Sequence, residues 1–335
     1  MPVLNYKTCS ASEKNAFRVL GKACVKDNAL LLPWSYGGLE FCFKGDRVIL
    51  EFGDYSDPSI AYIKAELDGN VSKYAVGRGG ERIVITAPED GAHTVRFMRV
   101  TEGMEPVRLL NVTVGGEDPS VTGVPHEAKT KLMFIGDSIT CGYGVDAPST
   151  SPFNTFEEDC TLTYAYMAAR EIGAEILFTG ASGKGIVANC EGNRADMTLR
   201  QAFVWETRQG GEWDARGYAP DCVVLNCGTN DAWGGVSDEE FYGTALAFLA
   251  EIRKTFPDVP LLWAYGIMDT SKIPCIKKAV EEFDLKNGKA YFLDCGCMAD
   301  HPGETGGGGH PNVNTSLRVY PALARKLKEI LCRKG

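Results

Sequence analysis

The stretch KLMFIGDSIT, residues 131–140, decides the fold of the larger part of this chain. It contains a run of four apolar residues (132–135), and a continuous run of this kind is typical of a parallel strand buried on both faces. The run stops at Gly136, and an acid, a serine and a polar turn follow. Chemistry in open α/β sheets lies just past the carboxyl ends of the strands, so Ser138 is a candidate nucleophile. The alternative is that Asp137 and Ser138 only cap the next helix.

The rest of the second half of the chain repeats this pattern of apolar strand and helix. Strands alternating with helices indicate βαβ units with right-handed crossovers and a five-stranded parallel sheet in an α/β domain. Apolar strands are expected at residues 131–136, 174–179, 221–227, 259–266 and 289–294. Helices are expected at about residues 161–172, 195–208, 238–255, 272–285 and 313–332.

In the first part of the chain, residues 1–118, apolar residues recur at every second position, as in β-strands. Short runs of alternating apolar and polar residues are separated by turn residues, which predicts an all-β sandwich with a jelly-roll-like topology. Gly45 and Asp46 are expected to turn the chain between two such strands. Residues 119–129 hold two prolines, a glycine and several polar residues and are expected to be a linker, so that the α/β domain occupies residues 130–335.

The composition excludes several classes of partner. The chain has 335 residues and a formal net charge of −9, which argues against nucleic acid or an anionic membrane surface as a partner. It has no apolar run of the roughly 18 residues that a transmembrane helix needs. The N-terminal residues 1–7 lack the apolar core of a signal peptide, so we expect a cytoplasmic protein, or a secreted one if a leader has been removed.

The twelve cysteines are scattered along the chain, and several fall inside expected strands. Without a secretory signal, reduced and buried thiols are expected. Cys295 and Cys297 have two histidines downstream, but their spacing fits no structural zinc pattern. We therefore expect neither a metal ion nor a cofactor.

The four histidines limit the choice of a base for Ser138, because a serine hydroxyl needs a base within hydrogen-bond reach to act at neutral pH. His93 falls in an expected strand and His126 in the linker. His301 and His310 are left, each followed by proline. His301 is alternatively a turn residue. His310 is favoured because it follows a glycine run and precedes a long amphipathic helix.

Four short blocks, in order, carry a resemblance to the SGNH (GDSL-type) hydrolases. These blocks are GDS around Ser138, ASGKG around Gly183, GTND around Asn230 and GHPN around His310. The resemblance implies a flavodoxin-like strand order, Ser138 as nucleophile and His310 as base. It also implies an oxyanion hole built from the backbone N–H groups of Ser138 and Gly183 and the side-chain amide of Asn230. The structural alternatives are a helix-entry turn at 180–185 and a cap or turn at 229–231.

One position departs from that family pattern. Most SGNH enzymes carry an aspartate three residues before the histidine, where this chain has Gly307. Since a third group normally holds the imidazole in its correct tautomer, a backbone carbonyl is expected to do so here, which leaves a Ser–His dyad. Asp300 and Glu304 are the nearest acids in sequence and are alternative partners for the imidazole.

The order of the two domains narrows the resemblance. A β-sandwich followed by an SGNH domain with GDSITCGYG (136–144) and ASGKGI (181–186) is similar to carbohydrate esterase family 2, in which some members work with a dyad. That resemblance implies hydrolysis of O-acetyl esters on sugars, with the primary 6-hydroxyl as one candidate position. Trp233 and Tyr265 either stack on the sugar or fill the core.

The sequence is also compatible with two other functions. One is a lipid or thioester acyl hydrolase on the same scaffold, which would need a long apolar groove. The other is a sugar-binding protein that has lost its chemistry, against which the four intact signature residues argue. The sequence specifies neither the sugar nor the oligomeric state.

Overall fold

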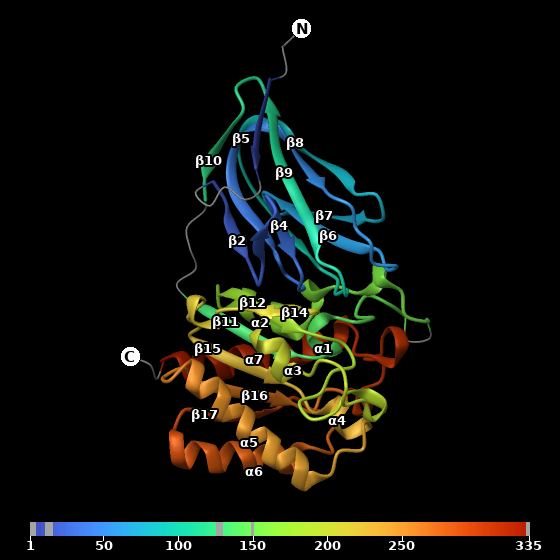
Figure 1. The fold of residues 1–335 in the computed structure, drawn as a ribbon, viewed down its shortest axis with the longest axis vertical. Helices are drawn as coiled ribbons and strands as arrows, with labels where there is room; N and C mark the ends of the chain where they lie inside the picture. The colour runs from blue at the N-terminus through green and yellow to red at the C-terminus, as the bar shows by residue number, and fades with distance from the viewer. Residues whose placement is uncertain (1–4, 11–15, 125–129, 149–150, 333–335) are drawn as a thin grey trace. The chain divides into compact units, whose positions relative to one another are not determined.

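The computed structural model describes residues 5–10, 16–124, 130–148 and 151–332 (Figure 1). The chain divides into two compact units by its internal contacts. The first consists of Met1–Glu127 together with Glu206–Gln209, and the second of Ala128–Trp205 and Gly210–Gly335. Among the described residues, the α-helices all belong to the second unit. None of these helices is long and apolar enough to cross a bilayer.

The first unit is built on one continuous antiparallel sheet. The strands run in the order β3-β4-β9-β5-β8-β6-β7, while β1 pairs with β9, and both β2 and β10 pair with β5. Their bounds are β1 (Asn5–Ser10), β2 (Arg18–Leu20), β3 (Cys24–Lys26), β4 (Ala29–Leu32), β5 (Gly38–Phe52), β6 (Ala61–Leu67), β7 (Asn70–Val76), β8 (Glu81–Arg99), β9 (Val107–Gly116) and β10 (Ser120–Gly123). The antiparallel β-domain predicted from alternation is therefore present, and its jelly-roll topology stays a prediction.

Strand β5 corrects one detail of that prediction. Gly45 and Asp46 do not turn the chain, because β5 continues through them and pairs with β8 on both sides of a register shift between Gly45 and Arg47. Gly45 has a φ of +149°, and a Cβ there would lie 2.3 Å from the carbonyl oxygen of Gly115. Glycine is needed at this position because a neighbouring strand passes against it, as at a β-bulge.

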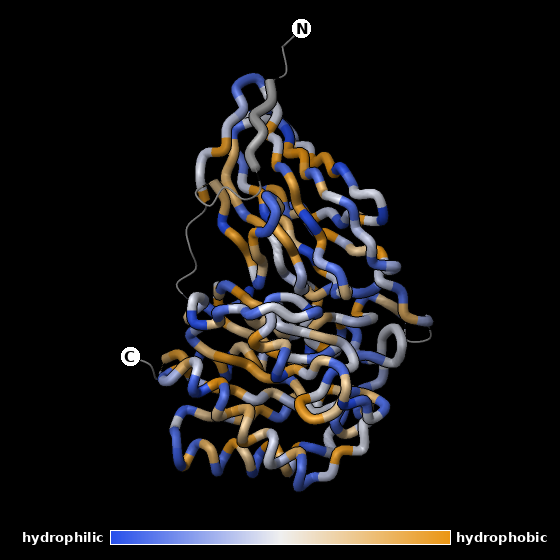
Figure 2. The backbone as a smooth tube through the Cα atoms, in the orientation of Figure 1, coloured by the Kyte–Doolittle hydropathy of each residue, from blue (hydrophilic) through white to orange (hydrophobic). Residues whose placement is uncertain are grey.

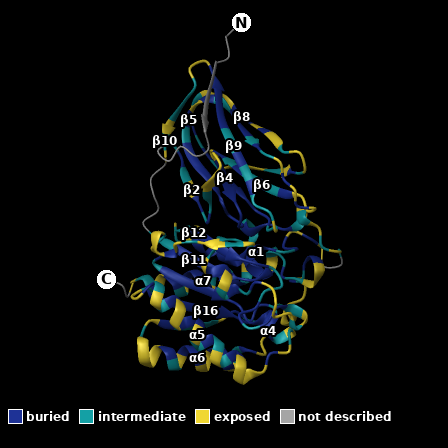
Figure 3. Cartoon of the chain, in the orientation of Figure 1, coloured by how far each residue is buried: buried dark blue, intermediate teal, exposed yellow. Residues whose placement is uncertain are grey.

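The core of the first unit is formed by every second residue along its strands, as is clearest in β6. Along β6, Ala61, Ile63, Ala65 and Leu67 are buried and the residues between them are half-buried. These four side chains join one apolar cluster that includes Phe41 and other inward-facing residues of β5, β8 and β9. Figure 2 shows apolar residues along the strands, and Figure 3 shows that much of their length is buried.

The predicted linker is only partly irregular. Residues 120–123 form β10 and pair with β5, so the sheet extends past residue 118. Residues 125–129, which include His126, lie outside the described residues. The predicted domain division, with the α/β domain at residues 130–335, differs from the structure at a second place, because Glu206–Gln209 belongs to the first unit. There the Trp34 Nε1–H donates to the Glu206 carbonyl at 2.8 Å, and Arg208 forms an ion pair with Glu102 at 2.5 Å.

The second unit is a five-stranded parallel sheet with the strand order β12-β11-β15-β16-β17. In chain order this is 2-1-3-4-5, the flavodoxin-like arrangement. The strands are β11 (Lys131–Gly136), β12 (Glu175–Gly180), β15 (Cys222–Asn226), β16 (Leu261–Tyr265) and β17 (Ala290–Asp294). All five predicted strands are confirmed, and β11 is buried from Leu132 onward as its apolar run requires.

Helices α2 (Tyr164–Glu171) and α7 (Val313–Cys332) pack together, as do α5 (Asp238–Thr255) and α6 (Ile273–Asn287). The predicted helix at 195–208 is wrong over most of its length. Helix α3 covers only Leu199–Val204, begins with a capping box between Thr198 and Gln201, and is followed by the hairpin of β13 (Trp205–Thr207) and β14 (Gly210–Glu212). Arg208 and Gln209 form the turn of this hairpin, and Gly210 and Gly211 at the start of β14 disfavour continued helix.

A partly buried ion pair joins β8 to the turn between β6 and β7 in the first unit. His93 Nδ1 lies 2.6 Å from Asp68 Oδ2, and its Nε2 lies 3.1 Å from the Glu89 carbonyl oxygen. Burial is the largest single influence and opposes the charged imidazole, but the hydrogen bonds with Asp68 and the Glu89 carbonyl, together with the charges of both acids, raise the pKa of His93 above its ordinary value. Burial also opposes the Asp68 carboxylate, but the Thr94 N–H and His93 lower its pKa overall.

We expect His93→Gln to destabilise the protein more near pH 5.5 than at pH 9. A raised histidine pKa stabilises the fold fully below the unfolded value of about 6.5, and this contribution is lost as pH rises through the folded value. The contribution of Asp68 has the opposite sign and is lost as pH falls below about 4. Thermal unfolding of wild type and variant at both pH values measures the difference, with the exposed His301→Gln as control. An equal loss of Tm at both values would contradict the prediction.

Candidate active site

The candidate nucleophile lies where β11 ends. Ser138 begins the short helix α1 (Ser138–Cys141), and the buried Asp137 caps it by accepting the Ile139 N–H at 3.1 Å. Gly136 is required just before this turn, because a Cβ there would lie 2.1 Å from Thr140 Oγ1. Ser138 is 5% exposed and is thus held on a rigid element at the carboxyl edge of the sheet.

His310 meets Ser138 from the loop between β17 and α7. Its Nε2 lies 2.9 Å from Ser138 Oγ, and its Nδ1 lies 3.2 Å from the Gly308 carbonyl oxygen. Because a carbonyl can only accept, the proton must be on Nδ1, which leaves Nε2 to accept the Ser138 hydroxyl proton. This is the tautomer that a general base for the serine needs.

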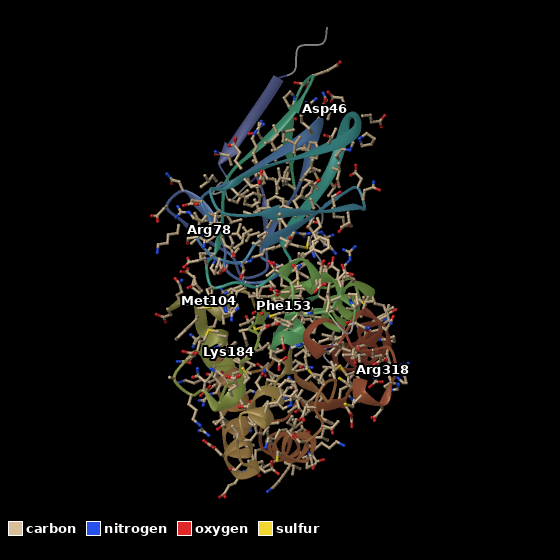
Figure 4. All side chains as sticks on the ribbon, turned by 90° about the vertical axis from the view of Figure 1, so that its right-hand side faces the viewer. Asp46, Arg78, Met104, Phe153, Lys184 and Arg318 are labelled. Carbon is tan, nitrogen blue, oxygen red and sulfur yellow. The ribbon has the colours of Figure 1, made fainter. Side chains whose placement is uncertain are left out.

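The nearby acids have other partners or face solvent. Glu304 is buried and forms an ion pair with Arg318, which Figure 4 labels. The Arg318 Nε–H donates to both carboxylate oxygens, at 2.7 and 2.9 Å. Asp300 and His301 are exposed. Arg318 also donates to the Cys295 carbonyl at 2.7 Å, so it fastens the start of the histidine loop to the end of β17. The structure therefore brings His310, and not His301, to the serine.

Gly307 has no room for the acid usual in the family. A Cβ at this position would lie 2.8 Å from Ala147 Cβ and 3.2 Å from Gly144 Cα. The backbones themselves are bonded, with the Gly307 N–H donating to the Gly144 carbonyl at 2.9 Å. The departure seen in the sequence is thus matched by the packing of the loop.

Gly183 and Asn230 follow the two strands that flank β11. Gly183 lies beyond β12 with a φ of +73°, and a Cβ there would meet Cys190 Sγ at 3.0 Å. Asn230 lies beyond β15 in α4 (Thr229–Trp233). Its amide donates to Asp137 Oδ2 at 3.2 Å and to the Lys184 carbonyl at 3.1 Å. Because both groups are acceptors, the two protons of the Asn230 amide are already engaged. An oxyanion would have to share one of these protons with its present acceptor, or replace that acceptor.

Asp231 shapes the loop after β12. The carboxylate is fully buried and accepts the N–H groups of Ile186, Val187 and Ala188 at 3.0, 2.7 and 3.1 Å. Burial raises the pKa of Asp231 while these three donors oppose the rise. The same loop carries Gly183, so Asp231 braces one side of the site.

An aromatic pair beside His310 was not anticipated from the sequence. Tyr143 and Phe153, the latter labelled in Figure 4, stack with ring centroids 3.6 Å apart, and the Tyr143 ring lies 4.3 Å from the His310 ring. In the sequence, the one indication of this pair is that Tyr143 follows Ser138 by five residues. No periodicity connects it with Phe153, because both lie in an irregular segment.

The two aromatic residues expected at a sugar site are in different surroundings. Trp233 is 53% exposed at the end of α4, three residues after Asn230, so its face is available to a ligand. Tyr265 is 1% exposed, and its hydroxyl donates to Asp269 at 2.7 Å. The interpretation of Tyr265 as a substrate contact is therefore wrong, because its ring is in the core against Gly228.

Ser138, Gly183, Asn230 and His310 all lie in a range of the chain that matches a known protein family. A model of the GDSL-like lipase/acylhydrolase family matches residues 134–326, more than half of the chain. The chain belongs to this family. The matched range includes all four site residues and excludes the first unit.

Two curated relatives of this GDSL chain are esterases by name. Cellulase/esterase CelE of Acetivibrio thermocellus is 26% identical over 313 residues, which cover 89% of this chain. An acetylxylan esterase / glucomannan deacetylase of Cellvibrio japonicus is 23% identical over 337 residues, which cover 97% of this chain and 91% of the relative. The chain spans 37% of the length of CelE.

A solved structure extends the likeness to both units. The family two carbohydrate esterase from Clostridium thermocellum, solved in complex with cellohexaose, matches with a TM-score of 0.86 at 22% identity. The match covers 94% of this chain and 99% of that one. At this identity the likeness shows a shared fold, including the antiparallel β-domain that precedes the GDSL domain.

We expect His310→Ala to lower kcat on an acetyl ester by at least about 10³-fold, the scale of losing a triad member. Asp300→Asn, Glu304→Gln and His301→Ala should each cost less than about tenfold, because none of these side chains contacts the imidazole. Circular dichroism checks folding of all four variants. A thousandfold loss in either acid variant would reveal a displaced triad acid, and an active His310→Ala would exclude His310 as the base.

We expect Asn230→Ala to lower kcat by about 10²–10³-fold while the fold survives, the usual effect of losing one oxyanion donor. The buried Asp137 carboxylate also loses a donor, so the unfolding free energy should fall by about 1–3 kcal/mol. Steady-state kinetics and urea unfolding measure the two effects separately. A folded variant with unchanged kcat would remove Asn230 from the oxyanion hole.

Proposed function

We propose that this GDSL-family chain is a carbohydrate O-acetylesterase that works with a Ser138–His310 dyad. The observation that carries the chemistry is the 2.9 Å contact between Ser138 Oγ and His310 Nε2, with the Gly308 carbonyl fixing the reactive tautomer. The substrate class is supported by the relatives, whose names include acetylxylan esterase and glucomannan deacetylase. A structural neighbour was solved with cellohexaose.

The reaction begins when Ser138 Oγ attacks the acetyl carbonyl carbon and its proton passes to His310 Nε2. The carbonyl oxygen becomes an oxyanion, which the N–H groups of Ser138 and Gly183 and the Asn230 amide stabilise. The intermediate collapses, the bond to the sugar oxygen breaks, and the imidazolium returns the proton to that oxygen. Water then attacks the acetyl-serine with His310 again as base, releasing acetate and restoring Ser138.

Several finer points belong to this proposal. The sugar substrate carries the acetyl group, Trp233 stacks on a sugar ring, and neither a metal ion nor a cofactor takes part. We also propose the jelly-roll-like topology for the first unit, supported by β5, which pairs with different partner strands along its length. The site argues against a sugar-binding protein without chemistry, because the base and nucleophile are within hydrogen-bond distance.

We expect acetyl esters to be hydrolysed with a much higher kcat/KM than octanoyl esters. 4-Nitrophenyl acetate and octanoate give this ratio, and release of acetate from acetylated xylo-, manno- and cello-oligosaccharides then identifies the sugar. Ser138→Ala should lose nearly all activity, whereas Ser271→Ala, an exposed serine of the same unit, should keep it. Preference for octanoate would favour the lipid acyl hydrolase instead. More than a tenth of the wild-type kcat in Ser138→Ala would exclude the nucleophile.

A further inference from the structure

A carboxylate that the chemistry above does not use lies beside the histidine loop. Glu157 ends a short 3-10 turn (Thr155–Glu157), and its carbonyl accepts the Asp146 N–H at 3.0 Å. Its side-chain Oε2 is buried and, among the described residues, has no hydrogen-bond partner. An ionised oxygen in such a position is costly unless a cation or a donor compensates it.

The position of this oxygen is specific. A Cβ built on Gly307 would lie 3.4 Å from Glu157 Oε2. Gly307 is the residue three before His310, where most SGNH enzymes place their acid. Gly307 and His310 are also neighbours in space, because the His310 N–H donates to the Gly307 carbonyl at 3.2 Å and closes a tight turn. A carboxylate from a distant segment therefore lies beside the backbone position from which the usual acid would extend.

We propose that Glu157 is a positioning residue that stabilises the imidazolium form of His310 across this turn. In a triad the acid both orients the imidazole and balances the positive charge that forms on it. Here the Gly308 carbonyl orients the ring, but a neutral carbonyl balances charge poorly. The proton that His310 takes from Ser138 creates a cation on the residue whose N–H closes the turn at Gly307, beside which Glu157 Oε2 is buried without a hydrogen-bond partner among the described residues. The catalytic consequence rests on the proposed function, whereas the effect on the imidazole does not.

The other charged or titratable groups that the structure describes around this turn have the following surroundings. Tyr143 packs on the His310 ring, and Asp146 is exposed. Glu158 and Asp159 follow Glu157 and are buried, with the Asp159 carboxylate accepting from Thr161. On the other side, Glu304 is paired with Arg318, and Asp137 accepts from Asn230. Of these carboxylates, Glu157 has the oxygen beside Gly307.

The direct test follows the titration of the His310 ring by NMR in the full chain, with the signal assigned through His310→Gln. We expect Glu157→Gln to lower the His310 pKa by at least about half a unit, because a nearby negative charge favours imidazolium. Asp146→Asn removes an exposed carboxylate from the same segment and should leave the pKa unchanged. This measurement needs no substrate, so it stands even if acetyl esters are not hydrolysed. An unchanged His310 pKa in Glu157→Gln would overturn the proposal.

Two further measurements separate a charge effect from a structural one. On 4-nitrophenyl acetate, the acid limb of the kcat/KM profile should move to lower pH by a similar amount, and kcat on the plateau should fall by about three- to tenfold. Because Glu157→Gln and Glu157→Leu both replace a carboxylate whose Oε2 is buried without a hydrogen-bond partner among the described residues, Tm should stay the same or rise in both variants. A fall of more than about 5 °C in both variants would assign Glu157 a structural role and overturn the proposal.

Discussion

The close contact between the backbones of Gly144 and Gly307 is the constraint on which the site depends. A Cβ on Gly144 would lie 2.3 Å from the Gly307 carbonyl oxygen, so neither residue can carry a side chain without moving the loop. This contact holds the histidine loop against the segment that leaves α1, and it brings His310 to Ser138. It also removes the position from which an acid would ordinarily reach the imidazole. The absence of a side chain at position 307 is therefore matched by the packing of the two backbones.

Buried carboxylates in this site serve mainly to hold backbone and amide groups. Asp137 joins the start of α1 to the Asn230 amide, while Asp231 gathers three N–H groups of the loop that carries Gly183. Each links two of the three strand ends that meet at the site. Such links fix the distances between nucleophile and donors, and catalysis by preorganised dipoles depends on those distances.

The sequence predicts what repeats or alternates, and it fails where a single contact decides. The bounds predicted for β11 and α7 agree with the structure, because β11 contains a continuous apolar run and the amphipathic pattern of α7 extends over 20 residues. At Gly45 the sequence predicts a turn where the structure has a register shift within β5, since alternation cannot distinguish a strand that bends from one that ends. The helix expected through residue 208 failed because residues 206–209 pack in the first unit. The place of Tyr265 in the core and the proximity of Glu157 to Gly307 both require the third dimension.

The segment 206–209 has a consequence for how the chain can be divided. Because it fills a place in the first unit, the chain crosses between the two units near residues 127, 205 and 209, not once. A cut near residue 130 would leave the first unit without the carbonyl that accepts from Trp34 and without the partner of Glu102. Recombination at the apparent linker would thus transfer an incomplete module. A transfer that keeps both units complete therefore has to move them together as one block.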